Sequence, residues 1–534
     1  MWGAEFVSNV GSWMQTVGAQ WLMLTVTGSA VYVSLVQTAA SLPVVLLAVL
    51  AGTIGDLVDR RHFLLVTQAV MLVAAVAPGV LALAGLVSPW VLLALVFAVG
   101  CGQALTSPTW LALQPELVGP AERPQAISLG AVNQNLARAV GPAIGGLLLA
   151  ATSAGTVFLV NAATFLAVIA VVWWWRGSRP ADALPREHVA EAVRAGGRYI
   201  AASPVLRAIL LRAGLFAFFA SSLWALLPLT AHSRLHLGSG GYGLLLGCVG
   251  LGALGGAGGL PRLRAWFGPG TQLTAGSIGM AVVALILALV HIAAIAAAAL
   301  VLGGLAWIVA LSTLFSLYQL SLPRWVKARG MSFLLVVFQG GGAAGSVAFG
   351  LAAQHIGLAP ALLAAAGGLA LGPLAGLRYR FTAIPPAELL PAGDWPQPNL
   401  AADASPGGPV MVTVEYLAAA GREDELLAAL RGSRFSRRRT GASSWRAWQD
   451  SGEASRILEQ FVVASWDEHL LQHSRVTTRD QHRYDAIRAM TAKGHPAAVT
   501  HWLTAGRRAG NDATPAGQPA PPPSGGNATE GEPS

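Results

Sequence analysis

Residues 52–61 read Gly52-Thr53-Ile54-Gly55-Asp56-Leu57-Val58-Asp59-Arg60-Arg61. This short charged stretch separates two long apolar segments. No charged residue lies between Glu5 and Asp56, and none lies between His62 and Glu116. Charged side chains so close to hydrocarbon must face water, because burying an isolated ion in an apolar medium is very unfavourable. We therefore place residues 52–61 in a turn at a membrane surface.

The composition is that of a membrane protein. Hydrophobic residues make up 54% of the 534 residues and charged residues only 11%, whereas soluble domains carry roughly 25% charged residues. Residues 1–378 contain 18 basic and 8 acidic side chains, and residues 379–534 contain 16 and 17. The positive excess therefore lies in the apolar part, which argues against nucleic acid as a partner and for membrane topology. The two cysteines, Cys101 and Cys248, lie in apolar segments and predict no disulfide framework.

Apolar windows predict twelve membrane-spanning helices, since a spanning helix needs about 20 apolar residues. The windows lie near 3–26, 30–54, 63–86, 89–113, 127–151, 156–175, 205–231, 241–260, 271–292, 294–320, 331–354 and 358–377. The first window begins at Met1 without a basic segment and is too long for a signal peptide, which leaves open a start further upstream.

Basic residues in the loops predict the orientation. With a cytoplasmic N-terminus, the inside loops contain thirteen basic residues, among them Arg60, Arg123 and Arg262, and the outside loops contain only Arg234. Both termini are then cytoplasmic. We divide the chain into a six-helix half, a central loop with an amphipathic tether helix, a second six-helix half, a linker, a small domain and a disordered tail. The boundaries are 1–176, 177–204, 205–378, 379–409, 410–505 and 506–534.

The two halves resemble each other at offsets of roughly 200–210 residues. Gly28-Ser29 recurs as Gly238-Ser239, the turn at 52–61 is matched by 259–264, and residues 135–146 are matched by 339–345. Two six-helix repeats related by an axis along the membrane normal are the architecture of rocking-switch alternating access. The fold class expected is an all-α membrane protein of two six-helix pseudo-repeats with a small α+β domain.

Four stretches together resemble the enterobactin-exporter-like branch of the major facilitator superfamily, which comprises secondary exporters of siderophores and drug-like compounds. They are residues 7–16, residues 52–61, residues 115–118 with 135–146, and residues 322–330. The resemblance covers residues 1–380 and implies a twelve-helix fold and export by proton antiport. The expected location is the inner membrane of a bacterium, and the expected partners are lipids, protons and a small amphipathic substrate.

The resemblance also implies a cytoplasmic gate at the charged turn. Asp56 would face the positive N-terminal end of a helix that begins near Lys327. It would also face Arg329, which lies at the same end of that helix. The expected gate residues are Gly52, Asp56, Asp59, Arg60, Arg61 and Arg329. The sequence departs from the family at Leu57, where arginine is common. A solvated surface turn is the alternative interpretation.

Polar residues at helical spacing indicate a substrate cavity, with packing between helices as the alternative interpretation of each. The candidates are Asn9, Ser12, Trp13, Thr16, Gln20, Gln103, Trp110, Asn135, Arg138, Ser316 and Gln319. Arg138 lies deep in a predicted helix and should either face a wet cavity or extend to the interface. Gly141, Pro142 and Gly145 predict a hinge or a close helix contact. Glu5 is the acidic residue in an apolar segment that could carry the coupled proton.

The C-terminal region has a different periodicity. Strands at 410–417, 443–449, 456–464 and 497–503 and helices at 423–431 and 467–490 follow the order βαββαβ, which predicts a ferredoxin-like domain. It resembles antibiotic-biosynthesis-monooxygenase-like domains, which usually form dimers. His469 and His473 have the spacing of metal ligands but lack an evident third ligand, so we predict no metal and no cofactor. A tail enzyme that modifies the cargo, and a non-transporting membrane sensor, are the alternative functions.

Overall fold

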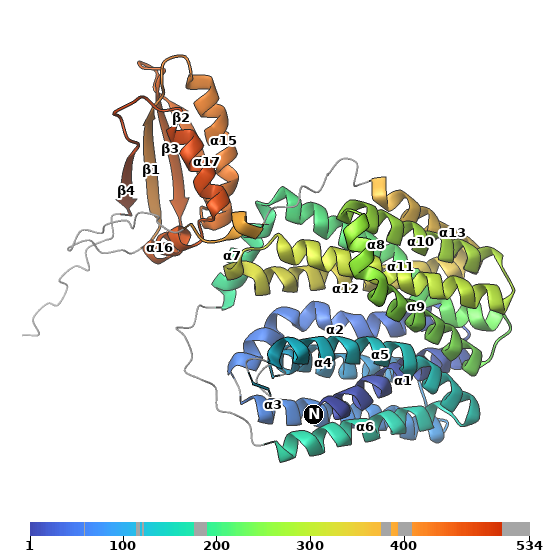
Figure 1. The fold of residues 1–534 in the computed structure, drawn as a ribbon. Helices are drawn as coiled ribbons and strands as arrows, with labels where there is room; N and C mark the ends of the chain where they lie inside the picture. Colours follow the sequence, from blue (N-terminus) through green and yellow to red (C-terminus); the bar gives the residue numbers. More distant parts are fainter. Residues whose placement is uncertain are drawn as a thin grey trace, which may run out of the picture. The chain divides into compact units, whose positions relative to one another are not determined.

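The computed structural model describes residues 1–57, 59–113, 118, 119, 122–175, 189–374, 386–392 and 408–504 (Figure 1). It divides into two compact units. One unit contains Met1–Trp395, Phe435–Thr440 and Ser474–Asp485, and the other contains the remaining residues.

The first part of the chain consists of long helices. Six precede the central loop: α1 (Trp2–Thr27), α2 (Ala30–Leu57), α3 (Arg60–Leu83), α4 (Pro89–Leu113), α5 (Arg123–Ala151) and α6 (Ala154–Trp174). The helix α7 (Val189–Ala201) follows, and then α8 (Pro204–Leu229), which continues into the π-turn η3 (Thr230–Arg234). The last five are α9 (Ser239–Trp266), α10 (Pro269–Leu289), α11 (Ala293–Leu320), α12 (Lys327–Ile356) and α13 (Leu358–Leu371).

Nine helices of the described part are long and apolar enough to cross a membrane. They are α2, α3, α4, α6 and α8 to α12, so the chain is a multi-pass membrane protein. Three predicted spans differ from these nine. The helices α1 and α5 are long but more polar, and α13 has only 14 residues.

Helix ends follow local chemical signals. Gly28 follows α1 with φ of 61°, a left-handed conformation that glycine adopts without steric cost, and its N–H binds the Leu24 carbonyl. Ser153 begins α6, and its hydroxyl accepts a hydrogen bond from the Thr156 N–H at 3.3 Å. These caps separate successive helices by only two residues, which brings neighbours in sequence into contact.

The helices form two groups that match the two halves of the sequence (Figure 1). In the first group α1 packs on α5 and α6, α3 packs on α4 and α6, and α2 packs on α4. The two groups meet mainly where α5 packs on α9 and where α2 packs on α12.

Glycine permits the closest approach between the groups. A Cβ atom added to Gly146 in α5 would lie 2.5 Å from the Gly243 Cα in α9, and one added to Gly243 would lie 2.5 Å from the Gly146 Cα. Since real Cβ atoms do not come so close to other atoms, only glycine fits at either position. The halves therefore contact each other backbone to backbone at this crossing.

The C-terminal region contains a four-stranded antiparallel sheet. Its strands are β1 (Val410–Leu417), β2 (Ser444–Gln449), β3 (Arg456–Val463) and β4 (Ala498–Leu503), in the order β2-β3-β1-β4. The helix α15 (Glu423–Thr440) joins β1 to β2. We expected one helix between β3 and β4, but there are two, α16 (Trp466–Ser474) and α17 (Thr478–Arg488). The Thr477 hydroxyl donates to the Asp480 carboxylate at 2.8 Å at the break between them.

Buried and less buried residues alternate along the strands, which gives the sheet a buried face and a more exposed face. Val410, Val412, Val414 and Tyr416 of β1 are buried, and the residues between them are less buried. Leu426 and Leu430 of α15 are buried as well. The Ser433 hydroxyl of α15 donates to a β3 carboxylate on the same face, so α15 covers this face.

A buried ion pair joins α15 to α17. The Arg439 guanidinium binds the Asp480 carboxylate, whose side chain is 1% exposed. Burial opposes ionisation of Asp480, but the charge of Arg439 and hydrogen bonds from Ser436 and Thr477 outweigh it and hold the pKa of Asp480 below its usual range.

We predict that Gly146→Val destabilises the protein, because the added side chain would overlap the backbone of α9. Overpacking of this kind costs about 1–3 kcal/mol. The measurement is the melting temperature in detergent, followed by size-exclusion chromatography after heating. Gly255→Val in α9 is the matched control, because a Cβ at Gly255 has no neighbour within 4 Å. Equal melting temperatures for the two variants would contradict the close crossing.

We predict that Asp480→Asn loosens α15 and α17, because breaking a buried ion pair leaves an uncompensated charge and costs about 3–5 kcal/mol. Since the pKa of Asp480 is lowered in the fold, its stabilisation is complete above the ordinary aspartate pKa near 4 and is lost as the pH falls below it. Hydrogen exchange of the full chain measures the protection of the backbone amides of α15 and α17. Asp424→Asn, at an exposed position, should leave it unchanged.

Candidate functional site

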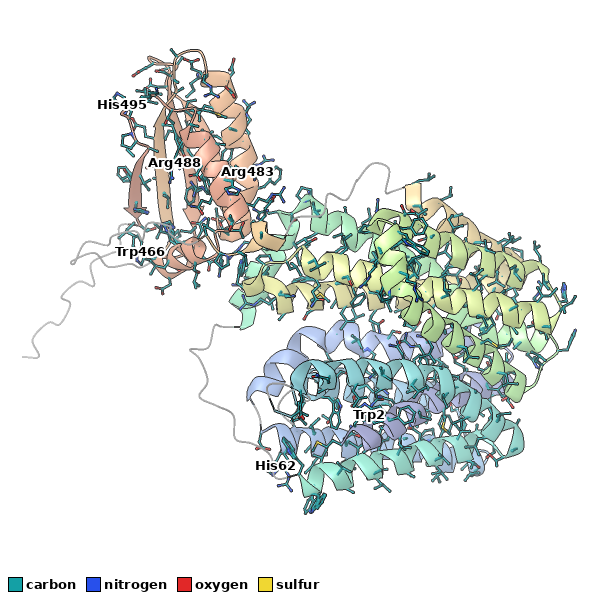
Figure 2. The ribbon with its side chains drawn as sticks, viewed as in Figure 1. Trp2, His62, Trp466, Arg483, Arg488 and His495 are labelled. Atoms are coloured by element: carbon teal, nitrogen blue, oxygen red, sulfur yellow. The ribbon has the colours of Figure 1, made fainter. Side chains whose placement is uncertain are left out.

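The turn between α2 and α3 is organised by Asp59. Its carboxylate accepts a hydrogen bond from the His62 N–H at 2.8 Å and lies 3.0 Å from the His62 Nδ1, so it caps α3 (His62 is labelled in Figure 2). The backbone N–H of His62 holds the pKa of Asp59 below its usual range. Asp59 is 61% exposed, so this cap lies in contact with water.

Arg61 binds the end of α6. Its Nη2 donates to the Trp173 carbonyl at 2.5 Å, its Nε donates to the Val172 carbonyl at 3.4 Å, and its guanidinium carbon lies 5.8 Å from the centre of the Trp173 ring. The C-terminal end of a helix carries a partial negative charge, which a cation stabilises. Arg61 thus joins α3 to α6.

For the remaining predicted gate residues the structure describes the helix to which each belongs, but only some of their contacts. Gly52 and Asp56 belong to the last turns of α2, and their surroundings, like the side chain of Arg60, lie outside the described residues. Arg329 lies in the first turn of α12. A Cβ at Gly196 of α7 would be 3.2 Å from the Arg329 Cβ, so Arg329 packs against α7.

Arg138 lies near the middle of the 29-residue helix α5. Its guanidinium carbon is 5.5 Å from the centre of the Trp13 ring, which lies near the middle of α1. The Arg138 Nε is buried and has no hydrogen-bond partner among the described residues. A cation–π contact stabilises a guanidinium but leaves its N–H donors available for an anion.

A cavity of about 40 Å³ lies between α1, α2 and α4. Three predicted residues line it: Ser12, Thr16 and Gln103. Gln15 and Gln37 also line it and were not predicted, although Gln15 stands three residues after Ser12 on the same helical face. A volume of this size holds about three waters, so a bulky substrate requires the helices to separate.

Two predicted cavity residues instead join helices. The Asn9 amide donates to the Asn133 carbonyl oxygen at 3.0 Å, and Asn133 is fully buried in α5. Gln20 is 2% exposed and binds two helices of the second half, α8 and α9. The structure therefore gives both a role in packing.

The other predicted residues lie apart from this cavity. Trp110 packs with Leu64 and Leu113 in an apolar cluster. Ser316 accepts a hydrogen bond from Arg264 at 3.1 Å, and Gln319 is exposed. Asn135 is half-buried in α5, and Glu5 is half-buried in the first turn of α1.

The glycines of α5 pack on α1. A Cβ added to Gly141 would lie 2.6 Å from the Trp13 Cβ, and one added to Gly145 would lie 2.7 Å from the Met14 Cα. The helix α5 continues through Pro142. Close packing therefore accounts for Gly141 and Gly145 in this conformation, and the hinge remains a prediction.

The C-terminal domain has a polar interior of its own. Glu459 of β3 is fully buried and accepts hydrogen bonds from Trp445 at 2.8 Å, Tyr416 at 3.1 Å and Ser433 at 3.2 Å. The sequence did not indicate this cluster, because its members come from four separate elements.

A histidine cluster includes two residues of α16, the helix that begins at Trp466 (Figure 2). The Nε2 atoms of His469 and His473 are 3.3 Å apart. His501 of β4 joins them, with its ring centre 4.8 Å from that of His469. Burial lowers the pKa of His501, which favours its neutral form. In the described ranges no three His, Cys, Asp or Glu side chains are positioned to hold a metal ion.

Curated transporters are similar to parts of this chain. The staphyloferrin A transporter of Staphylococcus aureus is 31% identical over 31% of this chain and 42% of its own length. The multidrug efflux pump Tap of Mycolicibacterium fortuitum is 26% identical over 39% of this chain and 52% of its own length. The enterobactin exporter EntS of Citrobacter koseri is 26% identical over 58% of this chain and 70% of its own length. The chain spans about half the length of the first two relatives.

Solved transporters share the fold. A bacterial homolog of the human lysosomal transporter Spinster, in an inward-facing and occupied conformation, has a TM-score of 0.56 at 16% identity, over 70% of this chain and 94% of that chain. A POT family transporter in complex with 5-aminolevulinic acid has a TM-score of 0.59 at 11% identity, over 71% and 95%. The family model described as transmembrane secretion effector matches residues 1–509. This chain belongs to the transmembrane secretion effector family of the major facilitator superfamily.

Proposed function

We propose that this protein is a secondary exporter of small amphipathic molecules that carry an anionic group, of the siderophore or drug-like type. The observation that carries this proposal is Arg138, a mid-helix cation stacked on Trp13. A charge at this depth is unfavourable unless it faces water, a counter-ion or a ligand. The Arg138 Nε is buried without a hydrogen-bond partner among the described residues, so a substrate carboxylate or phenolate is the anion that suits it.

The surroundings of Arg138 fit an amphipathic molecule. Trp13 offers an aromatic face to the guanidinium. Ser12 and Thr16, on either side of Trp13 in sequence, and Gln103 offer neutral hydrogen-bonding groups in the separate cavity between α1, α2 and α4. Ligand sites of this class are mostly apolar with a few placed polar groups. The relatives named as transporters of staphyloferrin A and enterobactin support a siderophore-like substrate.

The mechanism that we propose is alternating access between two six-helix halves. Six helices, α1 to α6, form the first half, and α8 to α13 form the second, with α7 between them. The helices α1, α5 and α13 complete the twelve spans. The basic residues of the predicted inside loops support a location of both termini in the cytoplasm of a bacterial cell. Proton antiport is the proposed driving force, with Glu5 as the proton carrier and Asp56, Asp59 and Arg329 at the cytoplasmic gate.

We propose that the C-terminal domain is a ferredoxin-like module that joins two copies of the chain. Its strand order and its antiparallel pairing support this fold. Trp448 and Trp502 are 47% and 53% exposed and lie on the sheet face opposite to the buried residues of β1. A second copy would cover these two rings.

We predict that Arg138→Met lowers transport of an anionic amphipathic probe by about tenfold or more, because hydrogen bonds to a charged group contribute about 1.5–3 kcal/mol. The assay is uptake into everted membrane vesicles under an imposed proton gradient, with an aromatic carboxylate and its methyl ester as paired probes. The ester should be affected much less than the carboxylate.

Arg212→Met in α8 is the matched control, since it removes another guanidinium from a membrane helix. Equal losses for both variants, or for both probes, would contradict recognition of the anion by Arg138. Uptake that ignores the proton gradient would contradict antiport and leave a facilitator.

We predict that Trp448→Gln with Trp502→Gln converts the full chain in detergent from a dimer to a monomer. The reason is that both substitutions replace exposed aromatic area with polar groups on one sheet face. Multi-angle light scattering measures the mass. Leu470→Gln changes an apolar side chain of similar exposure, 39%, outside the sheet and should leave the dimer intact. A wild-type monomer would contradict the proposal directly.

A further inference from the structure

A single buried amide bridges the two halves of the membrane part. The Gln20 side chain of α1 is 2% exposed. Its Nε2 donates to the Trp224 carbonyl of α8 at 3.3 Å, and its Oε1 accepts a hydrogen bond from the Tyr242 hydroxyl of α9. Tyr242 is fully buried. One side chain of the first half therefore satisfies polar groups on two helices of the second.

Aromatic rings surround this bridge. The Trp21 ring stacks on the Tyr242 ring, with centres 5.9 Å apart and planes at 19°. The His232 ring meets Trp21 edge-on, with centres 5.9 Å apart. His232 belongs to η3, the π-turn at the end of α8. Single π-turns in helices occur frequently at functional sites.

The halves are also joined on either side of the bridge. Gly146 and Gly243 bring α5 and α9 into backbone contact, and Gly243 directly follows Tyr242. The Gln354 side chain of α12 accepts hydrogen bonds from the Ser29 hydroxyl at 3.1 Å and the Ala30 N–H at 3.2 Å, at the start of α2. All of these contacts lie towards the end of the helices at which α1 finishes.

The bridge lies between the Arg138 site and that end of the molecule. Gln20 follows Trp13 by seven residues, which places it about 10 Å further along α1. In the orientation that we propose, α1 finishes at the outer face of the membrane. A substrate that leaves Trp13 and Arg138 for the outside must therefore pass the level of Gln20.

We infer that Gln20 and Tyr242 form the closing contact of the outer gate, an inference that rests on the proposed export function. Their polar groups satisfy each other where little water is present, so separating them without solvation would leave a buried donor and acceptor unpaired. The closed state is favoured until water or a polar substrate group replaces the bond. Gln20 and Tyr242 are thus positioning residues that set the balance between closed and open outer faces.

Tyr242→Phe tests the inference, because it removes one hydroxyl and keeps the ring stacked on Trp21. Spin labels at Val26→Cys and Ile292→Cys report the separation of the halves, since both residues are exposed and lie towards this end. The native Cys101 and Cys248 are replaced by serine. We expect the ratio of long to short distances to rise about three- to tenfold, the effect of losing one hydrogen bond.

Tyr318→Phe is the matched control. Tyr318 is as fully buried as Tyr242, but its hydroxyl has no hydrogen-bond partner in the described part of the chain. Its loss should leave the distance distribution unchanged. If Tyr242→Phe gives the same distribution as Tyr318→Phe in correctly folded protein, the inference is overturned.

A double variant separates this contact from general loosening. Gln20→Met removes the same hydrogen bond from the other side at similar side-chain length, together with the bond to the Trp224 carbonyl. If the two residues act as one contact, the double variant shifts the distances no more than the larger single change. Additive shifts would overturn the inference. The distances are measured without substrate, so a failure of the proposed substrate leaves this result unaffected.

Discussion

The interior of the membrane offers no water to satisfy polar groups, and this constraint explains where the polar residues of the chain lie. Asn9 binds Asn133, and Gln20 binds Tyr242, each across helices. Arg138 has an aromatic ring for a partner and a donor that remains unsatisfied among the described residues. The contrast between paired amides and this cation supports our proposal that Arg138 binds an anionic substrate.

Two described residues of the charged turn, Asp59 and Arg61, make contacts within one half of the molecule. Asp59 begins α3, and Arg61 binds the carbonyl groups that end α6, so these two helices are fixed to each other at this surface. The halves meet through different chemistry. Their interface uses glycine backbones and a few buried hydrogen bonds. Among the described residues, a half is thus held by a guanidinium on helix carbonyls, and the halves are held by close glycine contacts and interhelical hydrogen bonds.

Hydrophobic windows predicted most long helices to within a few residues, because burial in lipid needs a continuous apolar run. The contacts between side chains of different helices could not be predicted from hydrophobic windows. Asn9 and Asn133 are 124 residues apart in sequence, and only the fold brings them together. The same holds for His501, which a β-strand places beside His469. Ser316 belongs to a predicted polar stripe, but its hydroxyl accepts a hydrogen bond from Arg264. A stripe of polar residues indicates which face of a helix is polar, whereas the residue that contacts each side chain decides what that side chain does.

The contact between Gly146 and Gly243 has a mechanical consequence. Helices usually interlock because side-chain ridges of one fit grooves of the other, so a change of crossing angle requires ridges to leave their grooves. Two glycine backbones present no ridges at their point of contact. We therefore propose that the crossing angle of α5 and α9 can change at this point, so that the halves tilt without displacing a side chain between Gly146 and Gly243.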